Sequence, residues 1–183
     1  MKKTLALLTV IALLLSFALP AAATAAEILR LTNEQRAAHG ISAVRSNNPA
    51  LNAAAQLRAR EAASYWSHTR PDGSNWSTVL AQFNFIGYRS ASENLAFTSV
   101  NNPQNAINIW MNSPEHRANL LDASHDLVGI GVYFCTTARR YFWAQLFVDN
   151  GGLLRGAMRG ITAAVQWFWL IVLFPLRLLQ GLL

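Results

Sequence analysis

The fold of this chain is best predicted from one stretch, Ser113-Pro114-Glu115-His116-Arg117-Ala118-Asn119-Leu120-Leu121. Serine followed by proline and an acidic residue is typical of the first turn of a helix. Glu115 is therefore explained by a favourable interaction with the helix dipole, and His116 lies on the same turn. Leu120 and Leu121 mark the side of the helix that faces the core. The stretch predicts a short helix with a histidine beside its buried face.

Two further stretches carry polar residues of the kind that accompany His116 in a site. His68 lies in Ser67-His68-Thr69-Arg70-Pro71-Asp72-Gly73, a predicted loop, and Glu93 lies in Ser92-Glu93-Asn94-Leu95-Ala96, a predicted strand. The neighbours of Glu93 are small or apolar, so its carboxylate must be paired, hydrogen-bonded or solvated in a cleft. A neutral histidine and a carboxylate in one cleft can bind a divalent cation or exchange protons near neutral pH.

The helices are predicted from residues typical of helix starts and from glycine at a helix end. Three are expected over residues 27–38, 48–65 and 75–83, and a fourth begins at Asn102-Pro103. In the helix over 48–65, the charged residues Arg58, Arg60 and Glu61 are expected to face solvent.

The strands are predicted from runs of β-branched and aromatic residues. They are expected over residues 92–98, 127–136 and 141–148, and the last two form a hairpin with a loop of about four residues. Helices followed by a short sheet favour an α+β, layered domain.

Other reactive side chains in the chain have simple structural explanations. His125 is expected in a solvated turn, and His39, which precedes a glycine, in a helix cap. Cys135 is the single cysteine, so no intramolecular disulfide forms, and a buried, inert thiol is expected. No G-x-S-x-G, His-Glu-x-x-His or CxxC motif is present, and no organic cofactor is expected.

The N-terminal residues 1–25 are predicted to be a secretory signal peptide. Lys2 and Lys3 precede the apolar run from Leu5 to Leu19, and Ala23-Thr24-Ala25 fits a cleavage site. The alternative is an uncleaved membrane anchor, which the shortness of the run disfavours. Export to the cell envelope or the extracellular space is expected.

The C-terminal residues 150–183 are predicted to be a glycine linker followed by a hydrophobic helix. The run from Ile161 to Leu176 is almost wholly apolar, with a narrow polar stripe that includes Arg159 and Gln166. Such a helix can lie in a membrane interface, span the membrane or cap the domain. Membrane association is favoured over burial, which leaves residues 27–149 as the globular domain.

The charge balance excludes one class of function. The chain has a formal net charge of +6, but its arginines are scattered instead of clustered with stacking aromatic residues. A nucleic-acid partner is therefore not expected.

Together with Leu31-Thr32-Asn33-Glu34-Gln35-Arg36 and Val128-Gly129-Ile130-Gly131-Val132, the three stretches resemble the CAP superfamily in its bacterial SCP-like form. This is the superfamily of cysteine-rich secretory proteins, antigen-five allergens and plant pathogenesis-related proteins. The resemblance runs in order from about Ile28 to Val148. It implies a three-layer α-β-α sandwich with a small antiparallel sheet between the helices.

The resemblance also implies a cavity lined by two histidines and two acidic residues that holds zinc or another divalent ion in some relatives. His68, Glu93 and His116 fall on three of these positions. In eukaryotic relatives the fourth residue, a glutamate, falls about where this chain has Ser113, so Glu115 is the candidate replacement.

One more position departs from the family pattern. The glycine that usually precedes the Glu-Asn pair is replaced here by Ser92, and a different local strand geometry is expected, because serine resists backbone angles that glycine permits.

Three functions remain open at this point. The favoured one is an exported, membrane-associated binding module that uses the cavity for a divalent cation and an adjacent groove for a small lipid or peptide. The second is a metal-dependent hydrolase of cell-envelope peptide or ester bonds, with Glu93 as general base and metal ligands at His68 and His116. The third is a non-catalytic surface interaction domain.

Overall fold

The computed structural model describes residues 24–151. The chain divides into two units, Met1–Asn150 and Gly151–Leu183. Almost all of the predicted signal peptide and the predicted hydrophobic tail lie outside the described residues. Within residues 24–151, no helix has both the length and the apolar character needed to cross a membrane.

A three-stranded antiparallel sheet forms the centre of the domain. Its strands are β1 (Ser90–Thr98), β2 (Leu127–Cys135) and β3 (Arg140–Asp149), in the order β1-β3-β2. Cys135 pairs with Arg140, which leaves residues 136–139 as the hairpin loop and confirms its predicted length. Arg139 takes the left-handed conformation, with φ of 51°, that closes this turn.

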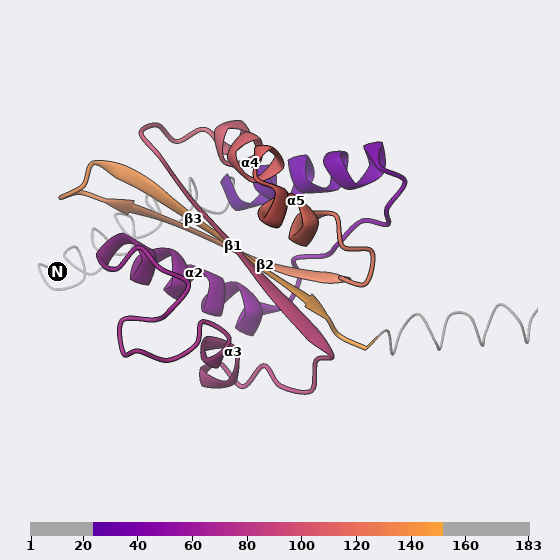
Figure 1. Cartoon of the computed structure of the whole chain (residues 1–183), viewed down its shortest axis with the longest axis horizontal. Coiled ribbons are helices and arrows are strands. Elements are labelled where there is room, and N and C mark those ends of the chain that lie inside the picture. Colours follow the sequence, from indigo (N-terminus) through magenta and orange to yellow (C-terminus); the bar gives the residue numbers. More distant parts are fainter. Residues whose placement is uncertain (1–23, 152–183) are drawn as a thin grey trace, which may run out of the picture. The chain divides into compact units, whose positions relative to one another are not determined.

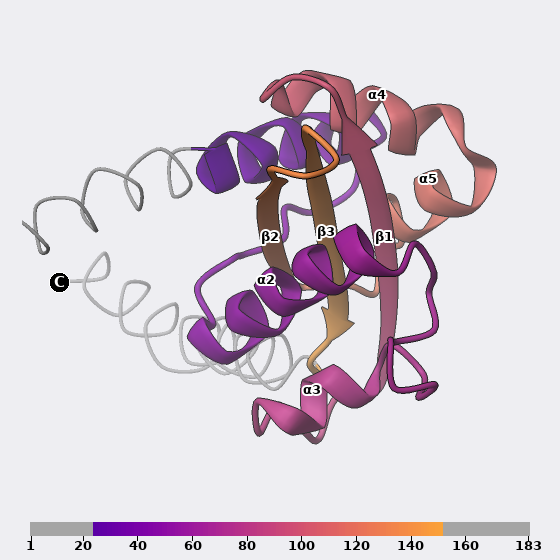
Figure 2. The same cartoon turned by 90° about the vertical axis from the view of Figure 1, so that its left-hand side faces the viewer.

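Helices cover both faces of the sheet, as predicted from the family resemblance (Figures 1 and 2). One face is covered by α2 (Pro49–Ser64), with the short α3 (Thr78–Gln82) beside it. The other face is covered by the helix over residues 24–38, α4 (Pro103–Asn112) and α5 (Pro114–Leu120). The domain is therefore an α-β-α sandwich whose two cores are separated by the sheet.

The helix starts follow the predicted capping residues with one exception. The side chains of Asn48 and Asn102 accept hydrogen bonds from the backbone amides of the first turns of α2 and α4. Ser113 caps α5 by position, but its side chain makes no capping hydrogen bond. The predicted helix over 75–83 is shorter than expected, because residues 75–77 form a hydrogen-bonded turn before α3 begins.

Two glycines allow α2 to lie directly on β2. A Cβ atom at Gly129 would come within 2.3 Å of the backbone oxygen of Leu51, and one at Gly131 within 2.1 Å of the backbone oxygen of Ala55. These contacts are with helix backbone, which cannot move aside as a side chain can. The Val-Gly-Ile-Gly-Val run therefore sets the distance between helix and sheet.

The expected exposure of three residues is wrong. Arg58 is fully buried and Glu61 is largely buried, although Arg60 is exposed as predicted. His125 is 2% exposed instead of solvated, and its ring stacks on Phe147 with 5.4 Å between ring centres. Arg58 and His125 are buried against partners distant in the sequence, Glu93 and Phe147, whereas Glu61 is paired with arginines three and nine residues away.

The expected burial of Cys135 and the expected change of strand geometry at Ser92 are not found. Cys135 is a free thiol, as expected, but it is half-buried at the end of β2 instead of inside the core. Ser92 lies in an uninterrupted ladder opposite Phe147, so serine is accommodated in regular strand geometry. Its hydroxyl is buried and has no hydrogen-bond partner in the part of the chain that the structure describes.

Candidate functional site

His68 and His116 line one cavity of about 390 Å³, together with Trp66, Ser67, Thr69 and Leu95. The centres of the two imidazole rings are 6.2 Å apart. His68 comes from the loop after α2, His116 from the first turn of α5, and Leu95 from β1. Three segments that are distant in the sequence thus meet at the β1 side of the sheet.

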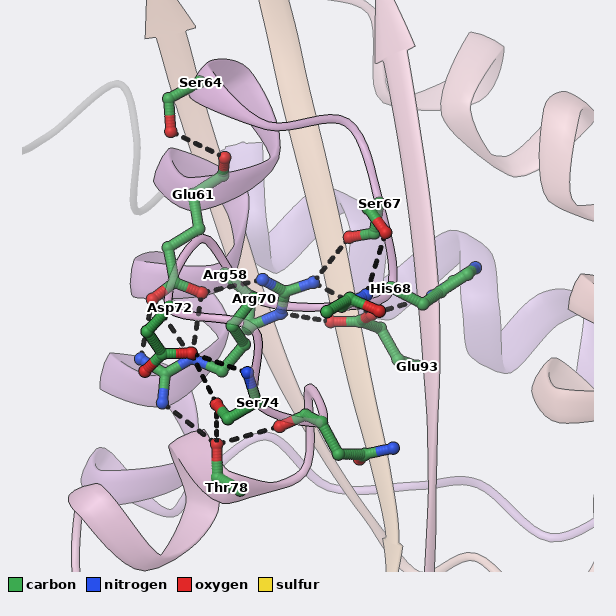
Figure 3. Close-up of polar contacts among 12 residues, drawn as sticks. Arg58, Glu61, Ser64, Ser67, His68, Arg70, Asp72, Ser74, Thr78 and Glu93 are labelled. Carbon is green, nitrogen blue, oxygen red and sulfur yellow. Dashed lines mark hydrogen bonds and ion pairs between the residues drawn. The ribbon is translucent and has the colours of Figure 1, made fainter.

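A buried carboxylate fixes the ring of His68 (Figure 3). Nδ1 of His68 donates a hydrogen bond of 2.8 Å to Oε1 of Glu93, whose side chain is only 1% exposed. Because Nδ1 is used in this contact, the other ring nitrogen, Nε2, is the one left for a ligand. The arrangement matches the carboxylate–histidine pairs that orient metal-binding imidazoles in other proteins.

Arg58 neutralises Glu93 from the opposite side. Its guanidinium donates to both carboxylate oxygens, at 2.6 Å from Nε to Oε2 and 3.2 Å from Nη2 to Oε1. The same guanidinium also donates to the carboxylate of Glu61 and to the backbone oxygen of Ser67. Since Ser67 precedes His68, Arg58 holds both the carboxylate and the loop that present the histidine.

The ion-pair network continues away from the cavity through Glu61 (Figure 3). Arg70 donates to Glu61, with a shortest contact of 2.6 Å, and its guanidinium reaches Thr78 and Gln82 on α3. Arg70 therefore ties the loop between α2 and α3 to both helices, which reduces the freedom of the segment that carries His68.

His116 is positioned mainly through its backbone. Asn94, next to Glu93 on β1, donates from Nδ2 to the backbone oxygen of His116 at 3.0 Å, and its Oδ1 accepts from Asn119 at 3.0 Å. Nδ1 of His116 is buried and has no hydrogen-bond partner among residues 24–151. A buried, unprotonated ring nitrogen is tolerable in a neutral imidazole, whereas an imidazolium would leave a buried donor unpaired.

The pKa values of the two histidines are shifted in opposite directions. The hydrogen bond to Glu93 raises the pKa of His68 above its ordinary value, although burial opposes the shift. Burial lowers the pKa of His116, the positive charge of His68 lowers it further, and Glu115 opposes both. The lowered pKa favours the neutral form of His116, which is the form that binds metal ions.

The structure brings together three of the four predicted cavity residues. His68 and Glu93 are hydrogen-bonded, and His116 faces His68 across the cavity. Glu115 is exposed on the first turn of α5 and influences both histidines through its charge. No group of three or more His, Cys, Asp and Glu side chains in residues 24–151 is arranged to hold a metal ion.

Sequence reasoning missed the importance of Arg58. A signal was present, because the buried positions of α2 recur at 51, 54, 55, 58, 59 and 62, and Arg58 lies on this apolar stripe. A charged residue on such a stripe needs a buried partner, and Glu93 was the carboxylate already expected to be paired, hydrogen-bonded or solvated in a cleft.

The fold and site define a secreted-type α-β-α sandwich domain with a histidine pair beside the sheet. The chain belongs to the CAP superfamily, because the model of the cysteine-rich secretory protein family matches residues 29–147.

Two Bacillus subtilis proteins are similar over 125 residues, or 68% of this chain: YkwD, at 26% identity, and the membrane protein YlbC, at 29%. The chain spans only 46% and 34% of the lengths of these two relatives.

Two solved structures share the fold. An extracellular SCP-domain protein from Bacillus anthracis superposes with a TM-score of 0.62 at 25% identity, over 70% of this chain and 41% of that one. An outer surface protein from Borrelia burgdorferi superposes with a TM-score of 0.60 at 18% identity, over 69% of this chain and 92% of that one.

Proposed function

We propose that this chain is an exported CAP-domain binding module that holds a divalent cation between His68 and His116. The observation that carries the proposal is the pair of imidazoles across one cavity, 6.2 Å between ring centres, with one ring anchored by a buried carboxylate. Export is supported by the signal-peptide pattern of residues 1–25 and by the extracellular and outer surface proteins among its relatives.

The residues present fit a divalent cation such as zinc. Imidazoles bound to one ion at about 2.0–2.1 Å have ring centres roughly 5 to 6 Å apart, so the observed separation requires only a small approach of the rings. The neutral form of His116 supplies one donor atom, and Nε2 of His68 supplies a second when that ring is neutral, with Nδ1 still hydrogen-bonded to Glu93. A bound cation would supply a Lewis-acidic centre with positions open to a further ligand.

Glu93 fits a positioning role better than a catalytic one. Its two oxygens already accept hydrogen bonds from Arg58 and His68, and its side chain is 1% exposed. A general base must instead reach the proton it removes, directly or through one water molecule. Glu115, exposed and close enough to act on both histidines, would contribute negative charge near the cation.

The cavity also fits a small organic ligand beside the cation. Its volume of about 390 Å³ is within the range of small-molecule sites, and its walls combine Trp66 and Leu95 with the hydroxyls of Ser67 and Thr69. A lipid headgroup or a peptide side chain with an anionic or carbonyl oxygen matches this lining.

Isothermal titration of the purified protein with zinc at pH 7.5 tests the cation site. The wild-type protein is expected to bind one equivalent of zinc, and the His68→Ala/His116→Ala variant is expected to show no heat of zinc binding. His39→Ala is the matched control, since His39 is exposed and lies outside the cavity. Equal heats from the wild type and the double variant would overturn the proposal.

The Glu93→Gln variant separates this function from a metal-dependent hydrolase. A positioning carboxylate predicts zinc affinity about 10–100-fold weaker, since the glutamine cannot hold His68 in the same way. A general base predicts unchanged zinc affinity with loss of turnover on peptide or ester substrates. Wild-type affinity in Glu93→Gln would contradict the role proposed here.

A further inference from the structure

Exposed aromatic and apolar side chains gather at one end of the domain. Of the seven large hydrophobic residues that are exposed within residues 24–151, five belong to three neighbouring segments. These segments are the residues that follow α2, the end of β1 with the β1–α4 connection, and the tip of the β2–β3 hairpin, which lie at the same end in Figure 1 (left). We name this surface the aromatic end: Tyr65, Trp66, Phe97, Val100 and Phe134, with Arg60, Arg139 and Arg140.

Ring contacts join several side chains of the aromatic end. Trp66 packs edge-on against Phe97, with 5.0 Å between ring centres, and also contacts Phe142. The guanidinium of Arg140 lies 4.7 Å from the centre of the Phe97 ring. Despite these contacts, half of Trp66 and more than a third of Phe97 remain accessible. Trp66 and Phe97 lie on the α2 side of the sheet and Phe134 lies on the opposite side, so these apolar groups surround the end of the sheet. Exposed apolar surface gathered in this way marks an interaction site.

The charges around these rings are all positive. Arg60, Arg139 and Arg140 are exposed there. The segments 62–70, 95–103 and 131–148 contain no Asp or Glu, and Glu61, which follows Arg60, is largely buried and paired with Arg58 and Arg70. The partner that complements this surface must therefore combine an apolar layer with negative charge.

We propose that the aromatic end docks the domain on an anionic lipid surface. Tryptophan and tyrosine favour the boundary between lipid chains and headgroups, because their rings are apolar with one polar atom. Each arginine beside them that reaches a negatively charged bilayer raises the affinity of the protein for the membrane about fivefold. Trp66 lines the His68–His116 cavity as well, so docking would bring that cavity close to the membrane.

Hydrogen–deuterium exchange of the full chain on lipid vesicles tests the proposal, because it reports each segment separately from the C-terminal tail. Vesicles of phosphatidylcholine with one quarter phosphatidylglycerol are compared with pure phosphatidylcholine. Slower exchange is expected at residues 64–67, 97–101 and 133–140 on the anionic vesicles alone, and it should weaken at 0.5 M salt. Equal protection on both lipids, or protection elsewhere in residues 24–151, would overturn it.

Two charge variants complete the test. Arg139→Gln/Arg140→Gln is expected to weaken binding of this end about 25-fold, seen as loss of the protection at residues 133–140. Arg89→Gln/Arg117→Gln removes the same charge from exposed arginines elsewhere and should leave the protection unchanged. Circular dichroism confirms that each variant is folded. Equal losses in both variants would show a non-specific charge effect and would contradict docking by this end.

Discussion

Replacing Arg58 by methionine tests whether the buried ion pair holds the site together. Arg58 is fully buried, and methionine fills a similar volume without the charge. The substitution leaves the carboxylate of Glu93, itself 1% exposed, without its cation. Removing one partner of a buried pair costs about 3–5 kcal/mol. For a domain of this size, that corresponds to a melting temperature roughly 10–20 °C lower.

Urea unfolding followed by tryptophan fluorescence measures this loss. Arg60→Met is the matched control, because Arg60 lies two residues along the same helix and is exposed. It should cost less than about 1 kcal/mol, the value typical of surface substitutions and exposed cation–π contacts.

A double-mutant cycle isolates the contribution of the pair itself. The double variant Arg58→Met/Glu93→Gln no longer has an unpaired buried charge. Its loss of unfolding free energy should therefore be smaller than the sum of the two single losses by at least about 1.5 kcal/mol. Glu61 retains Arg70 in all variants, so the cycle reports mainly on Glu93. Additive effects within about 0.5 kcal/mol, or a loss for Arg58→Met as small as the Arg60 control, would refute the reasoning.

Three further predictions concern His68, His125 and the glycines that face α2. NMR titration of Glu93→Gln should show the pKa of His68 moving down toward its ordinary value, and an unchanged pKa would contradict the hydrogen bond to Glu93. Burial lowers the pKa of His125, so near this pKa the folded state binds fewer protons than the unfolded state. The stability that the neutral, buried His125 contributes is therefore fully present above about pH 6.5 and is lost as the pH falls. His125→Gln should therefore reduce the slope of unfolding free energy against pH between pH 6.5 and 5, and an identical slope would argue against this contribution. Gly131→Ala should destabilise the domain by about 3 kcal/mol or prevent folding, because the added Cβ atom meets the backbone of α2. The control Gly40→Ala has open space around the added Cβ atom but a φ of +70°, and it should cost about 1–2 kcal/mol. Equal losses of stability in the two variants would contradict the close packing of α2 on β2.

The fold was predictable where the decisive interactions are local. Asn48 and Asn102 cap helices through contacts within three residues, and the β2–β3 hairpin needs only a four-residue loop between two β-type runs. The layer order came from the family resemblance, because the pairing of β1 with β3 joins residues about fifty positions apart. No local pattern contains that information.

The site was predictable in its residue types but not in its electrostatics. His68, Glu93 and His116 stood out by their neighbours; the two histidines line one cavity, and Glu93 is hydrogen-bonded to the ring of His68 without lining the cavity itself. The burial of Arg58 depends on Glu93, 35 residues away, and that of His125 on the ring of Phe147. Helix propensity and charge place such residues at the surface, and only tertiary contacts reverse that placement.

Nitrogen-15 NMR of the imidazole rings during zinc titration tests the central claim most directly. Ring nitrogens of His68 and His116 are expected to shift together and to saturate at one equivalent of zinc, while Nδ1 of His68 keeps its proton and its hydrogen bond to Glu93. His39 and His125 should not respond. Zinc shifts at only one of the two cavity histidines, or saturating shifts at His39 instead, would contradict a shared cation site.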